Sequence, residues 1–161
     1  MSPTTVSLVG ALDPRGGWQA LDCPIAHALD AVGNRTAFLV LREAFYGTTR
    51  FDDFAERVGI SESVAAARLK ALVEADMLER RPYREAGERT RSEYHLTAKG
   101  ADFFPVLVAL MAWGDRWEGA APVELAHHGC GAPLSAQVTC AHGHDVPVGE
   151  ADLVARDRRP R

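Results

Sequence analysis

A glycine-serine turn between two amphipathic segments constrains the fold of this chain more than any other feature. The large apolar side chains of residues 51–58 fall at i, i+3 and i+7, which places them on one stripe of a helix: Phe51, Phe54 and Val58. Gly59 can then take the left-handed conformation of a sharp turn, and Ser61 can cap the next helix. Residues 62–75 carry a second apolar face at helical spacing: Ala65, Leu69 and Leu72. The pattern predicts two helices packed across a short turn, the helix-turn-helix arrangement.

The hydrophobic period changes directly after this pair of helices. Residues 78–84 and 93–96 are short and strand-like, and a polar segment containing Gly87 separates them. This pattern predicts a β-hairpin with a long loop. A hairpin that follows a helix-turn-helix is called a wing, so the predicted fold class is mainly α with a small β wing.

Three further helices are expected around this motif. Pro24 begins a helix that ends near Gly33, and a second covers residues 35–45. Thr97 can cap a long helix reaching about Trp117, which Pro105 should bend or restart. The long helix is apolar over a wide arc, more than a small core needs, so we expect the terminal helices to form a homodimer.

The ends of the chain differ in composition from its middle. We expect residues 1–20 to form an arm with a short strand at 6–9, and residues 21–118 to form the winged domain. Residues 119–150, rich in Pro, Gly, His and Cys, are expected to form a small appendage, and the basic residues 151–161 a flexible tail.

Composition narrows the class of protein. The three cysteines among 161 residues are too few and of odd number for a disulfide framework, so reduced thiols in a cytoplasm are expected. No signal peptide is evident, and no apolar run approaches the roughly 20 residues that span a bilayer. No glycine-rich phosphate loop, Gly-x-Ser-x-Gly or His-Glu-x-x-His motif occurs, which argues against an enzyme. The net charge of -4 argues against non-specific coating of nucleic acid but leaves room for a local basic patch.

An ordered series of short motifs resembles one family. The motifs are Asp22-Cys23-Pro24-Ile25, Ala28–Gly33, Leu39–Glu43, Arg50–Phe54, Gly59–Ser61, Arg68–Leu72, Arg91–Gly100 and Trp113-Gly114. Together they resemble the HxlR-type regulators, relatives of MarR. The resemblance implies a dimeric winged-helix transcription factor, often a repressor, that binds double-stranded DNA at a roughly palindromic operator. It also implies that the helix at 62–75 enters the major groove and that the wing touches phosphate or the minor groove.

The residues expected to contact DNA lie on that helix and on the wing. On the helix they are Ser61, Ser63, Ala66, Arg68 and Lys70; Arg68 suits a structural ion pair as well as a DNA contact. Ala66, Ala67 and Glu62 depart from the family pattern and leave little direct base readout, so DNA shape is expected to carry part of the specificity. From Glu79 to Arg91 the wing has five arginines against three glutamates, and Arg84, Arg89 and Arg91 are its expected contacts.

Cysteine and histidine residues suggest two further roles. The resemblance implies that Cys23 can sense oxidants or electrophiles; the alternative is a small buried side chain. His127, Cys130, Cys140 and His144 have spacings that could hold zinc, although no cofactor is required and the alternative is a metal-free hairpin. The long apolar helix could also line a cavity for a small-molecule effector. The competing function is a winged-helix protein-interaction or ligand-binding dimer that has lost DNA binding.

Overall fold

The computed structural model describes residues 4–13, 15, 23–83, 91–119 and 121–155 and divides them between two units. One unit is formed by residues 23–135, and the other by the described residues of 1–22 and 136–161.

The helix-turn-helix forms as predicted. Helix α3 (Phe51–Val58) ends at Gly59, whose φ of 70° is left-handed, and the Ile60 amide donates to the Ala55 carbonyl at 3.0 Å. This pattern satisfies carbonyl groups that a helix end would otherwise leave unpaired. The Ser61 hydroxyl accepts from the Val64 amide at 3.4 Å and caps helix α4 (Glu62–Glu74). The turn therefore fixes the angle at which α4 leaves α3.

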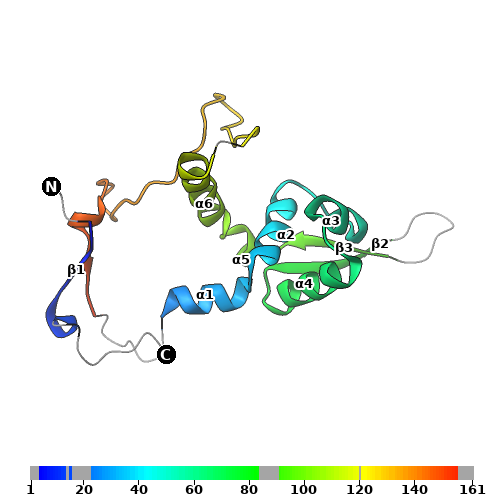
Figure 1. Cartoon of the computed structure of the whole chain (residues 1–161), viewed down its shortest axis with the longest axis horizontal. Coiled ribbons are helices and arrows are strands. Elements are labelled where there is room, and N and C mark those ends of the chain that lie inside the picture. The colour runs from blue at the N-terminus through cyan, green and yellow to red at the C-terminus, as the bar shows by residue number, and fades with distance from the viewer. Residues whose placement is uncertain (1–3, 14, 16–22, 84–90, 120, 156–161) are drawn as a thin grey trace. The chain divides into compact units, whose positions relative to one another are not determined.

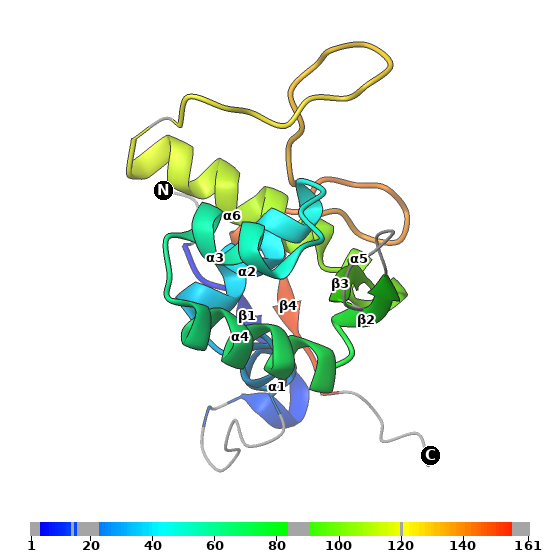
Figure 2. The same ribbon diagram turned by 90° about the vertical axis from the view of Figure 1, so that its right-hand side faces the viewer.

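The core of this unit lies between α2, α3, α4 and the hairpin (Figures 1 and 2). Helix α2 (Arg35–Phe45) begins where the Asn34 side chain accepts from the Ala37 amide at 3.2 Å. The largest fully buried side chains are Val40, Leu41, Phe54, Leu69, Leu72 and Leu78. The predicted inner face of α4 is confirmed, since Ala65, Leu69 and Leu72 are all 0% exposed.

The wing is an antiparallel pair of strands, β2 (Leu78–Tyr83) and β3 (Arg91–Leu96). Its register pairs Leu78 with Leu96 and Tyr83 with Arg91. The chain just before α3 lies along β3, because the Tyr94 amide donates to the Thr49 carbonyl at 2.9 Å and Arg50 forms a bridge with Glu93. The start of α3 is therefore joined to the root of the wing.

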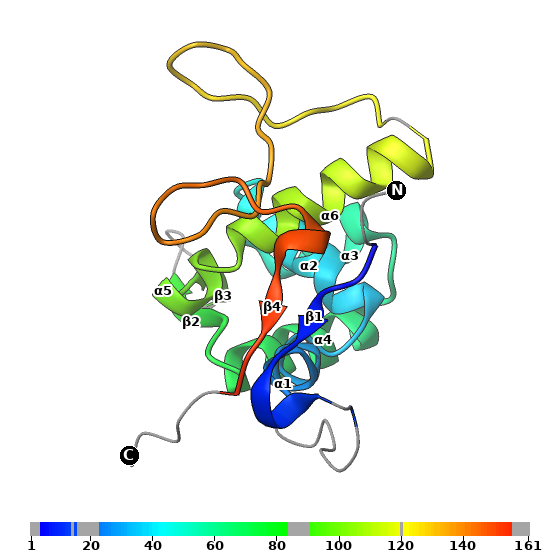
Figure 3. The same cartoon turned by 90° about the vertical axis from the view of Figure 1, so that its left-hand side faces the viewer.

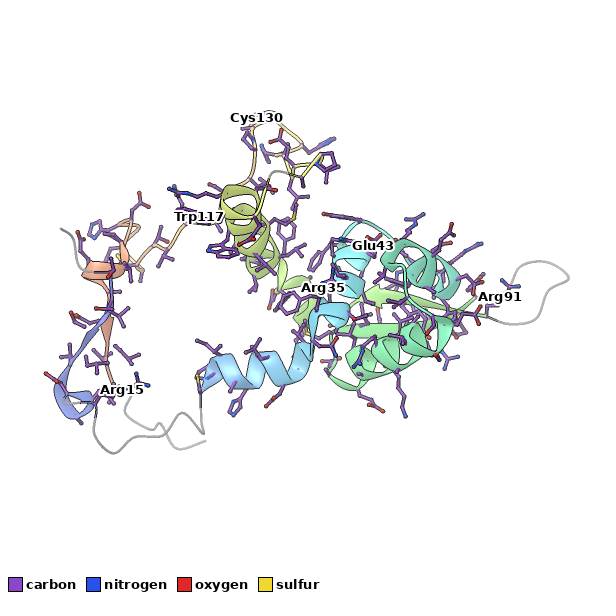
Figure 4. All side chains as sticks on the ribbon, in the orientation of Figure 1. Arg15, Arg35, Glu43, Arg91, Trp117 and Cys130 are labelled. Carbon is purple, nitrogen blue, oxygen red and sulfur yellow. The ribbon has the colours of Figure 1, made fainter. Side chains whose placement is uncertain are left out.

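A buried carboxylate holds the loop that leads into α3. Glu43, labelled in Figure 4, is only 6% exposed. Arg42 donates to its carboxylate at 2.7 Å, and the Thr48 hydroxyl donates at 3.4 Å. Arg57 in turn donates to the Thr48 hydroxyl at 3.0 Å. Because buried carboxylates need such partners, this network keeps the segment before Arg50 in place.

The long terminal helix is divided in two. Helix α5 (Ala98–Ala101) is capped by Thr97, and α6 (Phe104–Trp117) begins anew with Pro105 in its first turn. The expected break at Pro105 thus takes the form of a restart, because proline suits a first helical turn but not a helix interior. Helix α1 (Pro24–Val32) buries only Val32, and α6 only Leu107 and Val108. None of the helices in the described residues is long and apolar enough to cross a membrane.

The other unit is built on a two-stranded parallel pair, β1 (Ser7–Leu8) and β4 (Asp152–Leu153), shown side by side in Figure 3. The Ser7 amide donates to the Ala151 carbonyl at 3.0 Å, and the Val9 amide to the Leu153 carbonyl at 3.1 Å. The expected short strand at 6–9 is found. Asp152 and Leu153, near the start of the expected tail 151–161, pair with β1, and the structure describes this tail only as far as residue 155. The expected appendage 119–150 is also divided, since the unit boundary falls between residues 135 and 136.

Candidate nucleic-acid interface

Helix α4 presents one exposed face away from the core. Ser63, Ala66 and Lys70 are spaced by three and four residues, so they lie on one side of the helix, and all three are exposed. Ser61 is exposed at its start, with its hydroxyl 3.0 Å from that of Ser63. The structure therefore brings four of the predicted contact residues together on one surface.

The two basic residues of α4 have different surroundings. The Lys70 ammonium lies 3.7 Å from the Glu74 carboxylate, and both side chains are well exposed. Because an exposed ion pair of this kind is weak, Lys70 can exchange the Glu74 carboxylate for another anion at little cost in free energy. Arg68 is half-buried, and its Nε is buried without a hydrogen-bond partner among the described residues. The structural ion pair considered for Arg68 is therefore not formed in the described part of the chain.

The described part of the wing ends at the pair of Tyr83 and Arg91, where the two strands enter the loop. Arg84 and Arg89, expected to contact DNA, lie outside the described residues. Arg91 lies where β3 begins, with one guanidinium nitrogen 3.9 Å from the Asp52 carboxylate of α3 (Figure 4).

A cleft of about 440 Å³ lies beside Arg91 and was not anticipated from the sequence; we call it the wing-root cleft. Its polar lining comes from the start of α3 and from both strands: Arg50, Asp52, Arg80, Tyr83, Arg91 and Ser92. The guanidinium of Arg50 lies 5.1 Å from the centre of the Tyr83 ring, and the Arg80 Nε donates to the Ser92 hydroxyl at 2.6 Å. The sequence offered no signal for Arg50, which precedes a helix, or for choosing Arg80 over Arg81.

A separate apolar surface lies on α1 and α6. Val106, Leu110, Trp113 and Trp117 are 47–64% exposed and follow the four-three-four spacing of a helix-packing seam; Figure 4 labels Trp117 on α6. Ile25 and Leu29 of α1 are 69% and 55% exposed, and a groove of about 340 Å³ runs between α1, Phe38 and the start of α6. Cys23 caps α1 and is half-buried, without a side-chain capping bond.

The cysteine and histidine residues form two separate turns. In the first, the His127 Nδ1 lies 3.2 Å from the Cys130 sulfur, and both residues are exposed. In the second, the Cys140 amide donates to the His144 carbonyl at 3.0 Å, and backbone hydrogen bonds at His142 and then His144 lower the pKa of the Cys140 thiol. No three metal-binding side chains gather anywhere in the described ranges, and the two turns belong to different units.

The comparison with known proteins decides the family. A model of the HxlR-like helix-turn-helix family matches residues 31–121. The chain belongs to this HxlR-like family. It is 41% identical over 140 residues to the uncharacterised HTH-type transcriptional regulator Rv3095 of Mycobacterium tuberculosis (strain ATCC 25618 / H37Rv), covering 84% of this chain and 83% of that protein.

Solved structures of similar proteins agree with this assignment. The candidate transcription factor PA1607 has a TM-score of 0.76 and 34% identity, covering 85% of this chain and 96% of that one. The candidate transcription factor PA1374 of Pseudomonas aeruginosa has a TM-score of 0.61 and 38% identity, covering 86% and 95%. The expected HxlR family and winged-helix fold are confirmed, and the helix-turn-helix of this HxlR-like chain is the DNA-binding domain of a transcriptional regulator.

Proposed function

We propose that this HxlR-like protein is a cytoplasmic, homodimeric repressor without enzymatic activity that binds a pseudo-palindromic DNA operator. The observation that carries the proposal is the exposed face of α4, followed in the chain by a wing that has five arginines against three glutamates from Glu79 to Arg91. Helix α4 would enter the major groove with Ser61, Ser63 and Ala66 near base edges and Lys70 near a phosphate. Arg68, Arg84, Arg89 and Arg91 would supply further contacts.

The homodimer rests on the apolar surface of α1 and α6. In a two-fold dimer the same patch meets itself, and a row of large side chains at seam spacing on α6 suits packing against a second copy of that helix. Two copies would then present two α4 helices to successive major grooves, which explains why the operator should be palindromic.

The proposal is tested with DNA from upstream of the protein's own gene. A repressor dimer that contacts several phosphates should shift this DNA on a gel at low salt, and its affinity should fall steeply as salt rises. Arg89→Ala should flatten the plot of log affinity against log salt by about one unit per contact. A footprint that shows two half-sites would support the dimer.

A second function competes with this proposal. Ala66 and Ala67 offer α4 little for base readout, Glu62 adds a negative charge at its start, and the net charge is -4. These features favour an interaction or ligand-binding dimer that has lost DNA binding. If no DNA fragment from upstream of the gene binds at low salt, the result would support that alternative.

Two effector or cofactor roles are part of the proposal and are tested separately. Cys23 lies at the start of α1, so alkylating it should change DNA affinity if it senses electrophiles. Unchanged binding would remove that role. Zinc at His127, Cys130, Cys140 and His144 is tested by the metal content of protein purified without chelator, and a content near zero would exclude it.

A further inference from the structure

We propose that the wing-root cleft binds a phosphodiester group of the DNA backbone, held by Arg50, Arg80 and Arg91. The inference rests on the proposed DNA-binding function, and it adds to that function a contact formed by neither the exposed face of α4 nor the wing tip. It also assigns roles to Arg50, Arg80, Tyr83 and Ser92.

The cleft has the charge that a phosphodiester requires. Among the described residues that line it, three guanidinium groups face one carboxylate, that of Asp52. Asp52 and Arg91 are 3.9 Å apart, with side chains 75% and 57% exposed, so their ion pair is weak and a phosphate can compete for the arginine. Arginine also matches a phosphate better than lysine does, because its planar fork donates two parallel hydrogen bonds.

Two of the arginines are already oriented. The Ser92 hydroxyl accepts from the Arg80 Nε, which fixes the plane of that guanidinium, and the Tyr83 ring lies beneath the guanidinium of Arg50. Backbone pairing of Thr49 and Arg50 with β3 holds the start of α3 against the wing. Because little side-chain freedom remains to be lost on binding, these contacts favour a bound anion.

The position of the cleft fits a duplex that also reaches α4. Asp52 lines both the wing-root cleft and a neighbouring hollow that extends to Ser61 at the start of α4. That hollow carries two further carboxylates, those of Glu56 and Glu62. Because these carboxylates repel phosphate, the DNA strand that passes the start of α4 should place its phosphates against the arginines of the cleft.

The experiment measures DNA affinity against salt concentration for Arg80→Gln, Arg50→Gln and a matched control, Arg81→Gln. Arg81 is the next residue of the same strand but does not line the cleft, and its guanidinium pairs with Glu79. We expect each cleft variant to weaken DNA binding about tenfold, as for a lost charge-assisted hydrogen bond. Each should also flatten the plot of log affinity against log salt by about one unit for each cleft that contacts the DNA. The loss should be equal on operator and unrelated DNA, and Arg81→Gln should match the wild type.

A fourth variant tests the charge argument in the opposite direction. Asp52→Asn removes the carboxylate of the cleft, so it should tighten DNA binding several-fold, and circular dichroism spectra should confirm that every variant is folded. If the wild type binds DNA but the cleft variants behave like Arg81→Gln, or Asp52→Asn weakens binding, the inference is wrong while the proposed function stands. If the wild type binds no DNA at low salt, both are overturned.

Discussion

Replacing Trp113 with alanine should separate the proposed dimer into monomers. Trp113 lies in the middle of the exposed row on α6, flanked by Leu110 and Trp117, and it is 56% exposed in the single chain. Its exposed surface is available to a second copy of the chain. The truncation leaves the buried side of α6, Leu107 and Val108, unchanged.

The magnitude follows from the area that Trp113 can still bury. A tryptophan buries about 150–250 Å² when fully covered, so an exposure of 56% leaves roughly 100 Å² for a partner. At about 25 cal/mol per Å² this area is worth about 2.5 kcal/mol in each copy. Both copies lose it in a two-fold dimer, about 5 kcal/mol in total, which raises the dimer dissociation constant by roughly three and a half orders of magnitude.

Sedimentation velocity over a range of concentrations measures this constant for the wild type and for Trp113→Ala. Val138→Ala is the control, because Val138 is 72% exposed but belongs to the other unit and is part of neither α1 nor α6. A wild type that stays monomeric at high concentration, or a Trp113→Ala dimer as stable as the wild type, would refute the placement of the dimer seam on α6.

Two further predictions concern stability and thiol chemistry. Gly100→Ala should lower the free energy of unfolding by about 1–3 kcal/mol, because an added Cβ would lie 2.0 Å from the Met77 carbonyl oxygen. Urea titration should show no such loss for Gly114→Ala, where the added Cβ meets no atom within 4 Å and alanine favours the helix. Alkylation of Cys140, followed by mass spectrometry against pH, should reach half its maximal rate at lower pH in the folded chain than in urea, because backbone hydrogen bonds at His142 and His144 lower the pKa of that thiol. Equal midpoints in the two conditions would contradict this.

The helices were predictable because their signals are local. Gly59 and Ser61 lie next to each other in sequence, and the apolar spacing of α4 repeats within one segment, so the bounds of α3 and α4 agree with prediction to within a residue. The strand pair β1 and β4 gave no comparable signal, since each strand has two residues and its partner lies at the other end of the chain. The division of the expected appendage follows from that long-range pairing.

The wing-root cleft shows why part of the candidate site escaped prediction. Arg80 and Arg81 are equivalent in sequence, and only strand register distinguishes them, because it brings Arg80 beside Ser92 while Arg81 pairs with Glu79. Arg50 precedes a helix and acquires its place from backbone pairing with β3, a contact across more than 40 residues of chain. Charge counting identified the wing as basic but could not say which arginines share one cleft.

The geometry of α4 and that of the wing root support each other within the proposed function. The exposed face of α4 has two hydroxyls and an alanine methyl near its start, and these can distinguish few base pairs by hydrogen bonding. Affinity must then come mostly from phosphate contacts, and specificity from how readily a sequence places its backbone against fixed arginines. Because Arg50 and Arg80 are held by Tyr83 and Ser92, a change in local groove width should move a phosphate out of the cleft. Operators that differ in flexible steps between the half-sites, but not in contacted bases, should therefore differ in affinity, and Arg80→Gln should reduce that difference.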